Sequence, residues 1–581
     1  SIGTNASFDQ TNGTVVFEGT ATQTIEVDNA TFNAVRLDNG INDGNTTLTN
    51  PKIFDGSLTI TNGLRLRENA YLESTTPNHS HTFRDFRGDN TDLTAYNFSG
   101  GSITLTGAGG NTLRGSGNIT LSLGDDEIFI DGPVQVQDGD VVQVNNNVTI
   151  LSGYLLTDGD GTALEAEFVS IAATPGTHTL TANPNTIIYA RGTDNFPTTF
   201  AADLKPGSEV RFDEGIDQNI PLEDDAGNPY TFSNFEIRGG NKTKTLTGTP
   251  NDLVINQRFL IDGNNITLDA ANKNIIVGGS IPYNDTGFSI TSPGNLTLNG
   301  GDNNQYIQPV ITVNELIINK PNLTDIREVN FLGSITANGG ITISNPNGSQ
   351  TNLLDINLRE NQFIGDGGDN LTLNTNVRLR TDRETAFFTS LTADFQPGSL
   401  VLFEDNDNDT NSQDIPGGTY GGIQINGGEK DVVADITVLD NFEALRSRSR
   451  LNDATTTITV EGNWINAFGE NESMPAVVFD GNNDQDINGT RFSDVTFGGS
   501  GTKTISRNGT RLYGDLVIND GVTVDNGDRV MAVEGDWTEN NGTFTQLPDG
   551  ITRFEGASAT QTVTAQPAST FGDIQLRNST T

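Results

Sequence analysis

The sequence predicts an all-β fold, namely a right-handed parallel β-helix in which about 25 coils stack into a solenoid. Three observations carry this prediction: a recurring phrase, short segments in which apolar and polar residues alternate, and turn residues between them. The clearest copy of the phrase spans 477–497 and reads VVFDGNNDQDINGTRFSDVTF. One such unit cannot bury its own apolar face, so units of this kind stack on their neighbours.

Each copy has a strand ending in Phe, an acidic or glycine turn, Gln-x-Ile/Val, a second turn, and then an aromatic residue with two apolar residues at alternate positions. Further copies span 15–37, 210–237, 401–425 and 552–576, with a weaker copy around Gln305-Tyr306-Ile307. The spacing between copies ranges from about 75 to nearly 200 residues. Because tandem modules of fixed size would keep their spacing better, a solenoid is preferred to the alternative, a string of β-sandwich modules.

Shorter phrases support the same architecture. Gly-polar-Leu/Ile-x-Leu/Ile occurs at 56–60, 117–121, 294–298 and 514–518, and indicates a turn followed by a short strand. A third phrase, Val-Glu-Gly-Asn/Asp-Trp, contains the only two tryptophans, Trp464 and Trp537, which we expect at equivalent packing positions. The one helical candidate is 440–450.

We expect residues 1–581 to form a single continuous β-solenoid that is a segment of a longer chain. The best-defined repeat units are 399–475, 476–550 and 551–581. Open strand edges at the ends of such a stack need caps or partners, so the expected partners are neighbouring segments or copies of the same protein, joined end to end.

The composition excludes several function classes. The formal net charge is −43, from 75 acidic and 32 basic residues, so the surface repels nucleic acid. The chain has no cysteine and therefore no disulfide or thiolate metal site. No apolar run reaches the roughly 18 residues that a membrane span needs, so direct membrane insertion is not expected.

The most calcium-like segment is EDNDNDTNSQD at 404–414, in which Asp405, Asp407 and Asp409 alternate as oxygen ligands do around a hard cation. The segment replaces the turn of a repeat copy, and it lacks the glycine and closing glutamate of an EF-hand loop. An inserted solvated turn is therefore the preferred interpretation, and calcium the one candidate cofactor. Asp480, Asp484 and Asp486 are interpreted in the same way.

Other candidate sites are weaker. His79 and His81 could present two imidazoles from one strand face, but no third ligand is near in sequence. Carboxylate pairs such as Asp125-Asp126 and Asp224-Asp225 are two among dozens, with few basic partners. No Gly-x-Ser-x-Gly, phosphate loop or dinucleotide fingerprint is present, so the sequence predicts no enzymatic activity and no catalytic residue.

The repeat phrase, followed by Gly-Asp-Leu-x-Ile at 514–518, resembles repeats in very large cell-surface proteins of Bacteroidota, including gliding-motility proteins and adhesins exported by the type IX route. The resemblance covers the last 180 or so residues well and the remainder in patches. It implies a long extracellular stalk or adhesin at the cell surface. The sorting domain expected in such proteins is not in the sequence.

These observations give two functional hypotheses. The first is a non-enzymatic extracellular surface protein that forms the shaft of an adhesive or motility filament. The alternative is a β-helix that binds or cleaves polysaccharide, with surface polysaccharide as partner. A cluster of acids, aromatics and arginines in one groove would favour the alternative.

Overall fold

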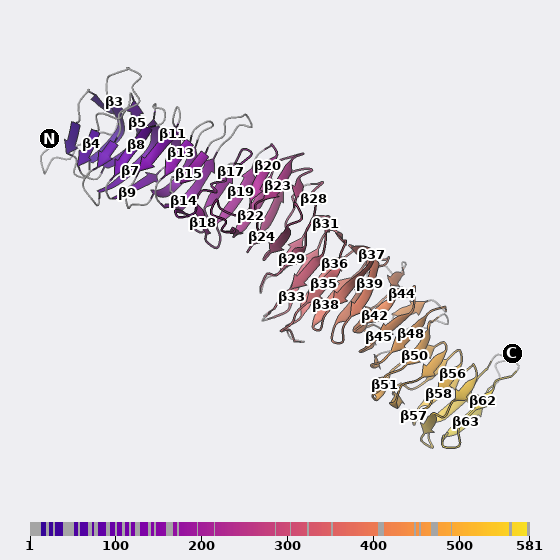
Figure 1. Ribbon diagram of the computed structural model, residues 1–581. Helices are drawn as coiled ribbons and strands as arrows, with labels where there is room; N and C mark the ends of the chain where they lie inside the picture. The colour runs from indigo at the N-terminus through magenta and orange to yellow at the C-terminus, as the bar shows by residue number, and fades with distance from the viewer. Residues whose placement is uncertain are drawn as a thin grey trace. The chain divides into compact units, whose positions relative to one another are not determined.

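The computed structural model contains strands and turns, and no helix among the residues it describes (Figure 1). Before residue 174, the structure describes residues 13 and 147 and fifteen strands. From there on it describes residues 174–577 except 195, 214, 285, 302–303, 322, 324, 350–351, 405–411, 447–448, 453–454, 466–473, 490 and 557–559. The chain divides into two compact units, Ser1–Gly294 and Asn295–Thr581.

The first unit is built from four sheets. The longest contains Thr14–Glu18 (β1), Ala30–Asp38 (β3), Leu58–Arg67 (β5), His79–Gly88 (β7), Gly101–Thr106 (β9), Asn111–Arg114 (β10), Ile128–Val136 (β12), Val148–Thr157 (β14), Thr179–Ala182 (β16), Ile187–Ala190 (β17), Ala201–Leu204 (β18), Glu209–Asp213 (β19), Asn234–Arg238 (β22) and Phe259–Asp262 (β25). A second contains Gln23–Glu26 (β2), Lys52–Asp55 (β4), Leu72–Ser74 (β6), Leu93–Phe98 (β8), Asn118–Ser122 (β11), Val141–Val144 (β13) and Glu167–Ser170 (β15). The other two contain Gln218–Pro221 (β20), Thr243–Thr247 (β23), Thr267–Asp269 (β26) and Ser289–Thr291 (β28), and Thr231–Phe232 (β21), Asp252–Ile255 (β24) and Asn274–Val277 (β27).

The second unit has three faces. Face I contains Leu296–Leu298 (β29), Ile311–Val313 (β31), Leu316–Asn319 (β32), Ile335–Ala337 (β34), Ile341–Ser344 (β35), Phe363–Leu373 (β37), Phe388–Phe395 (β39), Gly418–Tyr420 (β42), Ile436–Val438 (β45), Thr457–Val460 (β48), Ala476–Phe479 (β50), Val495–Phe497 (β53), Leu516–Ile518 (β56), Trp537–Glu539 (β59) and Val563–Thr564 (β62). Face II contains Gln305–Ile307 (β30), Arg327–Phe331 (β33), Leu354–Arg359 (β36), Val377–Thr381 (β38), Leu400–Glu404 (β40), Gly422–Asn426 (β43), Phe442–Ala444 (β46), Trp464–Ile465 (β49), Gln485–Ile487 (β51), Gly501–Ile505 (β54), Val522–Gly527 (β57) and Thr543–Gln546 (β60). Face III contains Gln413–Ile415 (β41), Glu429–Val432 (β44) and Arg450–Asn452 (β47), then Arg491–Phe492 (β52), Thr510–Leu512 (β55), Val530–Val533 (β58), Ile551–Phe554 (β61) and Asp573–Leu576 (β63).

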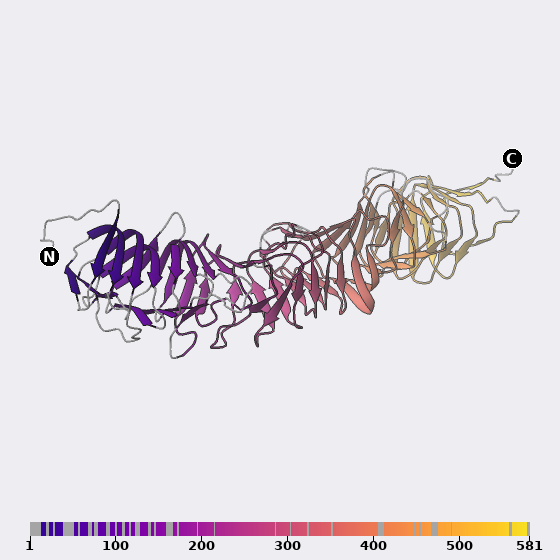
Figure 2. The ribbon, with the colours of Figure 1, turned by 90° about the horizontal axis from the view of Figure 1, so that it is seen from above.

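The predicted parallel β-solenoid is confirmed. All strand pairs in the described parts are parallel, each strand bonding to its counterpart in the next coil; Val495 pairs with Leu516, and Leu516 with Trp537. Figure 2 shows these strands side by side within each unit. β-Sandwich modules would need antiparallel sheets, so the alternative fold is wrong for these residues.

The described residues form about 19 turns, fewer than the 25 coils expected. The expectation divided the whole chain evenly into short coils, whereas some coils carry long insertions and some residues lie outside the described set. Tyr154, for example, pairs with Ile187, 33 positions later, whereas Val477 pairs with Val495, 18 positions later.

The core lies inside each stack of coils because alternate strand residues point inward. In β50 the inward residues Val477 and Phe479 are 1% and 0% exposed. Phe479 stacks on Phe497 of the next coil, with 5.5 Å between ring centroids and 17° between ring planes. The alternation read from the sequence therefore marks the interior face of each strand.

The repeat phrase does not stay on one face. Phe479 closes β50 on face I, whereas Phe554 closes β61 on face III, eleven strands later. Three strands make one turn, so the phrase advances by three and two-thirds turns from one copy to the next. The two tryptophans follow the same rule: Trp464 and Trp537 are both 0% exposed, as a packing role predicts, but they lie on faces II and I. Trp464 and Trp537 therefore occupy equivalent positions in the repeat phrase but lie on different faces of the solenoid.

The predicted helix at 440–450 is wrong. Its described part contains strand β46, in which Phe442 pairs with Ile423 of the preceding coil and Trp464 of the following one. The Phe442 and Trp464 rings are nearly parallel, with centroids 4.7 Å apart. Packing between coils thus overrides the weak local helical pattern.

Candidate functional site

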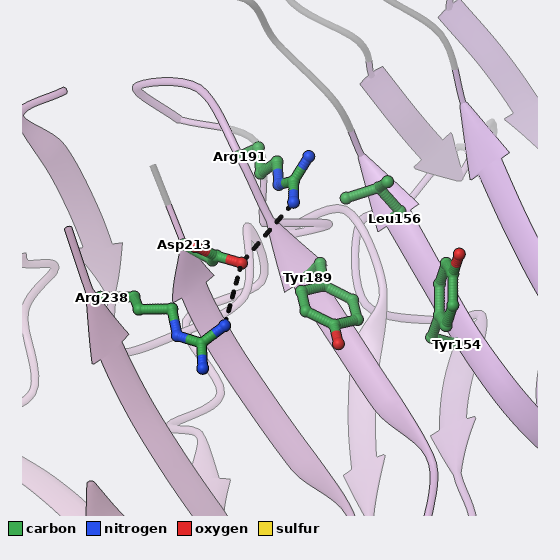
Figure 3. Close-up of a pocket in the computed structure, with 6 residues that line it drawn as sticks. All are labelled: Tyr154, Leu156, Tyr189, Arg191, Asp213 and Arg238. Carbon is green, nitrogen blue, oxygen red and sulfur yellow. Dashed lines mark ion pairs between the residues drawn. The ribbon is translucent and has the colours of Figure 1, made fainter. Parts of the chain in front are cut away.

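A pocket of about 220 Å³ opens on the outward face of the longest sheet of the first unit (Figure 3). Its lining residues come from β14, β17, β19 and β22 and the residue after β17: Tyr154, Leu156, Tyr189, Arg191, Asp213 and Arg238. We call this set the Tyr–Arg pocket. It is smaller than the roughly 300–1,000 Å³ of sites for drug-sized ligands, so it suits a group the size of one small ring.

Strand register places these side chains together. Leu156 pairs with Tyr189, and Tyr189 with Arg211, so these three residues form one outward row across three coils. Asp213 pairs with Arg238 in the neighbouring row. Successive parallel strands are about 4.8 Å apart, so a side chain from each coil reaches the same small volume.

The two tyrosines form the apolar side of the pocket. The ring centroids of Tyr154 and Tyr189 are 5.3 Å apart with an interplanar angle of 82°, an edge-to-face contact. Arg211 lies against the second ring, with its Cζ 5.2 Å from the centroid and its Nη1 donating to the Tyr189 hydroxyl over 3.0 Å. The Tyr189 ring is thus fixed by a cation–π contact and a hydrogen bond.

Asp213 forms the polar side, between two guanidinium groups. Its Oδ2 is 3.6 Å from Nη2 of Arg191 and 3.8 Å from Nη1 of Arg238, and the Asp213 side chain is 20% exposed. Both separations exceed hydrogen-bond length, so the pairing is electrostatic and leaves the carboxylate able to accept a hydrogen bond from a ligand.

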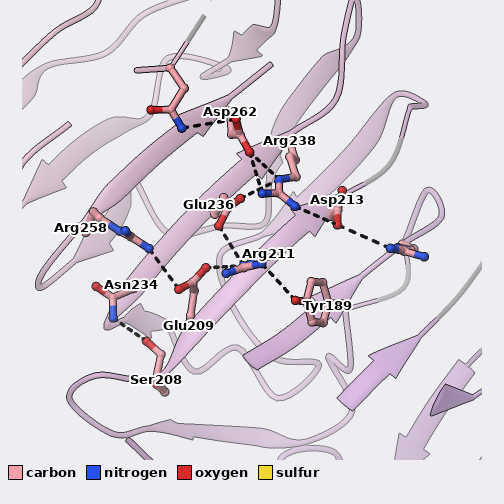
Figure 4. Close-up of polar contacts among 12 residues, drawn as sticks. Tyr189, Ser208, Glu209, Arg211, Asp213, Asn234, Glu236, Arg238, Arg258 and Asp262 are labelled. Carbon is pink, nitrogen blue, oxygen red and sulfur yellow. Dashed lines mark hydrogen bonds and ion pairs between the residues drawn. The ribbon is translucent and has the colours of Figure 1, made fainter. Parts of the chain in front are cut away.

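A charged network continues from the pocket onto β22 and β25 (Figure 4). Glu236 is 1% exposed and lies between Arg211 and Arg238, with each Nε 2.9 Å from one of its carboxylate oxygens. Arg238 also donates from Nε to Asp262 over 2.7 Å. Because these contacts hold Arg238, its orientation toward Asp213 is set before any ligand arrives.

Burial raises the pKa of Glu236 to about 7; a hydrogen bond with Glu209 adds to the rise, and Arg211 and Arg238 oppose it. The pKa of Glu209 is instead lowered, because its bonds to Glu236 and Arg211 and the charge of Arg258 outweigh the effect of burial. The two carboxyls thus differ in proton affinity. Since Glu236 is almost fully covered, this pair serves the network rather than an exposed reaction centre.

The network balances its charges. It contains four arginines and four acids: Arg191, Arg211, Arg238 and Arg258, and Glu209, Asp213, Glu236 and Asp262. With equal numbers of basic and acidic groups, the network lacks the excess of acids that gives the chain as a whole a formal charge of −43.

The predicted calcium ligands Asp405, Asp407 and Asp409 lie outside the described residues, so calcium binding there stays a prediction. No group of three or more potential metal ligands occurs within the described part of the chain. His79 and His81 lie in β7, where the backbone is described and these side chains are not.

Two of the acidic residues considered as turn ligands or catalytic pairs, Asp484 and Asp224, accept hydrogen bonds from backbone N–H groups. Asp484 accepts a hydrogen bond from the backbone N–H of Thr502 in the next coil over 2.7 Å. Asp224, 3% exposed, accepts from the N–H groups of Ala226 and Asn228 over 2.9 and 2.8 Å. The pair Asp125-Asp126 lies outside the described residues.

The same capping repeats as a column. Asp494, Asp515 and Asp536 each accept, over 2.7 Å, a hydrogen bond from a backbone N–H group one coil later. The donors are the N–H groups of Asp515, Asp536 and Thr562, respectively. Part of the acidic composition is therefore structural, since a carboxylate that accepts a backbone N–H satisfies a strand end at each coil.

Sequence reasoning missed a set of buried polar residues. Lys244, Lys320, Lys430 and Lys503 are at most 2% exposed, and they are half of the eight lysines in the chain. Three of them pair in register with the glutamine of the repeat phrase in the preceding coil: Gln218 with Lys244, Gln413 with Lys430, and Gln485 with Lys503. We call these the Gln–Lys columns.

Each glutamine donates to carbonyl oxygens of the coil before it. Gln218 donates to Ala190 and Gly192 over 2.9 and 2.8 Å. Lys244 in turn donates to the carbonyl oxygen of Ile216 over 3.2 Å and to the side-chain oxygen of Gln218. The signal was present in the sequence, because a Gly-rich turn precedes each of these lysines and an apolar residue lies two positions after it.

Within the described residues no helix is long and apolar enough to cross a membrane. Neither the family models nor the curated proteins nor the solved structures contain a match to this chain, so its assignment rests on the β-solenoid repeat fold itself.

Proposed function

We propose that the chain is a structural protein of the cell surface, whose solenoid units form part of the shaft of an adhesive or motility filament. The observation that carries the proposal is the bonding of each coil to the next through parallel backbone ladders and buried Gln–Lys columns. Such a stack has contacts only between neighbouring coils, so it can extend by repetition and holds its cross-section along its length.

Composition supports an extracellular location. A net charge of −43 keeps exposed protein soluble and apart from other acidic surfaces, and the stack needs no disulfide for its stability. The partners in this proposal are neighbouring segments or copies of the chain, stacked end to end. The resemblance of the repeat phrase to gliding-motility proteins and adhesins of Bacteroidota points to attachment or gliding as the process served.

The test uses cells of the source organism. An antibody raised against 295–581 should label intact cells, and deletion of these residues should reduce attachment or gliding while leaving growth unchanged. Replacing them with a solenoid of equal coil number and unrelated surface should restore the phenotype, because the proposed role depends on the stack and not on one site. Label confined to permeabilised cells would contradict the proposal.

A further inference from the structure

We propose that the Tyr–Arg pocket of the first unit binds a neutral saccharide. The pocket joins two aromatic rings to a carboxylate flanked by guanidinium groups (Figure 3). This assignment does not depend on the structural role proposed above, since a spacer needs no such pocket.

The aromatic side fits the apolar face of a sugar ring. Tyr154 and Tyr189 both line the pocket, and their rings contact each other edge to face, with 82° between ring planes. Tyrosine combines a large apolar surface with a hydroxyl that can bond to the ligand rim. A free inorganic anion has no apolar surface that could pack against these rings.

The polar side fits adjacent hydroxyl groups. Asp213 can accept a hydroxyl hydrogen, and Nη1 of Arg238, which is 3.8 Å from Asp213 and thus not bonded to it, can donate to the neighbouring hydroxyl oxygen. Arg191 lies on the opposite side of Asp213, at 3.6 Å. An acceptor beside a donor at this spacing is the arrangement that two vicinal hydroxyls require.

The charge favours a neutral ligand over an acidic one. The guanidinium groups beside Asp213 belong to a network of four arginines and four acids, so they offer an acidic ligand no large excess of positive charge, and the chain's charge of −43 opposes approach of any polyanion. A neutral saccharide does not meet this electrostatic repulsion.

The pocket is also rigid. Its residues extend from adjacent strands of one parallel ladder, with Tyr189 held by Arg211 and Arg238 held by Glu236 and Asp262. Binding therefore costs little ordering of side chains, which is the condition under which a shallow site gains affinity.

The test measures binding by isothermal titration calorimetry, using the whole chain and hexasaccharides of neutral β-glucan, α-glucan, mannan, galactan and xylan, with hexagalacturonate as the acidic probe. We expect a dissociation constant of about 1 mM for at least one neutral probe, and weaker binding of hexagalacturonate. Tyr154→Ala and Asp213→Asn should each weaken binding at least about tenfold.

Tyr513→Ala is the matched control, because Tyr513 lies under Arg511, at 5.3 Å, much as Tyr189 lies under Arg211, and is outside the pocket. Its binding should equal that of the unaltered chain. Tyr154→Ala keeps the proposal testable if Asp213→Asn perturbs folding, which thermal melting would reveal. Absence of binding by every neutral probe at about 10 mM, stronger binding of hexagalacturonate, or unchanged binding by Tyr154→Ala would each overturn the proposal.

Discussion

Lys503 lies one coil after Gln485 at the same register position, and both side chains are buried, at 0% and 2% exposure. The Lys503 ammonium donates to the carbonyl oxygens of Gly481, Asn483 and Ser500, over 2.6, 3.3 and 2.8 Å. The Gln485 side chain donates to Val460, one coil earlier, over 3.1 Å. Two side chains thus tie three successive coils at one corner.

We predict that Lys503→Met lowers the free energy of unfolding of the unit Asn295–Thr581 by about 3 kcal/mol, because buried carbonyl oxygens lose their donor and each costs about 1–3 kcal/mol when unsatisfied. Urea denaturation followed by circular dichroism measures the change. Arg577→Met is the control in the same unit: Arg577 is 54% exposed and forms a surface pair with Glu555, which contributes about 0–1 kcal/mol. Equal effects of the two substitutions would contradict a stabilising role for the column.

The aspartate column gives a second prediction. Asp515→Ala should destabilise the second unit by about 1 kcal/mol, because the N–H group of Asp536 loses its acceptor. Asp515→Asn keeps a side-chain oxygen at that place and should cost less; Asn441 already accepts from the N–H of Asn463 in this way. If alanine and asparagine are equally destabilising in urea, charge rather than capping explains the column.

A third prediction follows from the close approach of neighbouring coils. A Cβ atom at Gly462 would lie 2.0 Å from the carbonyl oxygen of Asp440 in the preceding coil, so Gly462→Ala must displace backbone. We expect a loss of roughly 2–3 kcal/mol, as overpacking typically costs. Gly301→Ala is the control, since nothing lies within 4 Å of the added atom there. Thermal unfolding of both variants tests the difference, and a neutral Gly462→Ala would show that the coils can separate without cost.

The fourth prediction concerns pH. Burial raises the pKa of Glu236 to about 7 from the ordinary 4.5, so the folded protein keeps a proton that the unfolded chain releases between those values. Its contribution to stability is therefore fully present below about pH 4.5 and is lost as pH rises through about 7. The lowered pKa of Glu209 acts below about pH 4.5 and in the opposite sense.

Glu236→Gln cannot titrate, so the fall in melting temperature of the first unit between about pH 5 and pH 8 should be smaller in this variant than in the unaltered chain. Differential scanning calorimetry at both pH values provides the measurement. Identical pH dependence in the two proteins would mean that Glu236 is already ionised at pH 5 in the folded state.

The fold was predictable because two sequence patterns arise from the stacking of coils: the alternation of apolar and polar residues along each strand, and the loosely spaced repeat phrase. Phe479 and Gln485 were recognised as recurring positions, and both are buried. The helix at 440–450 was wrong since Phe442 belongs to a ladder with Ile423, a contact 19 positions back that no local pattern contains.

The Tyr–Arg pocket was not predictable from the chain order. Tyr154, Tyr189, Asp213 and Arg238 are separated by 20 to 40 residues of irregular length, and only the register between coils brings them together. The lysines were missed for a different reason: Lys244 and Lys503 stand between threonines, and such Thr-Lys-Thr segments are typical of exposed strands.

The aspartate column also makes one edge of the second unit behave as a line of fixed charge. Asp494, Asp515 and Asp536 repeat once per coil, about 4.8 Å apart, which is less than the Debye length of about 8 Å at physiological ionic strength. The neighbouring carboxylates of Asp494, Asp515 and Asp536 therefore repel one another, and mobile cations gather along this edge as counterions do along a polyelectrolyte. Each coil added to such a stack would then be held more firmly in seawater than in dilute buffer.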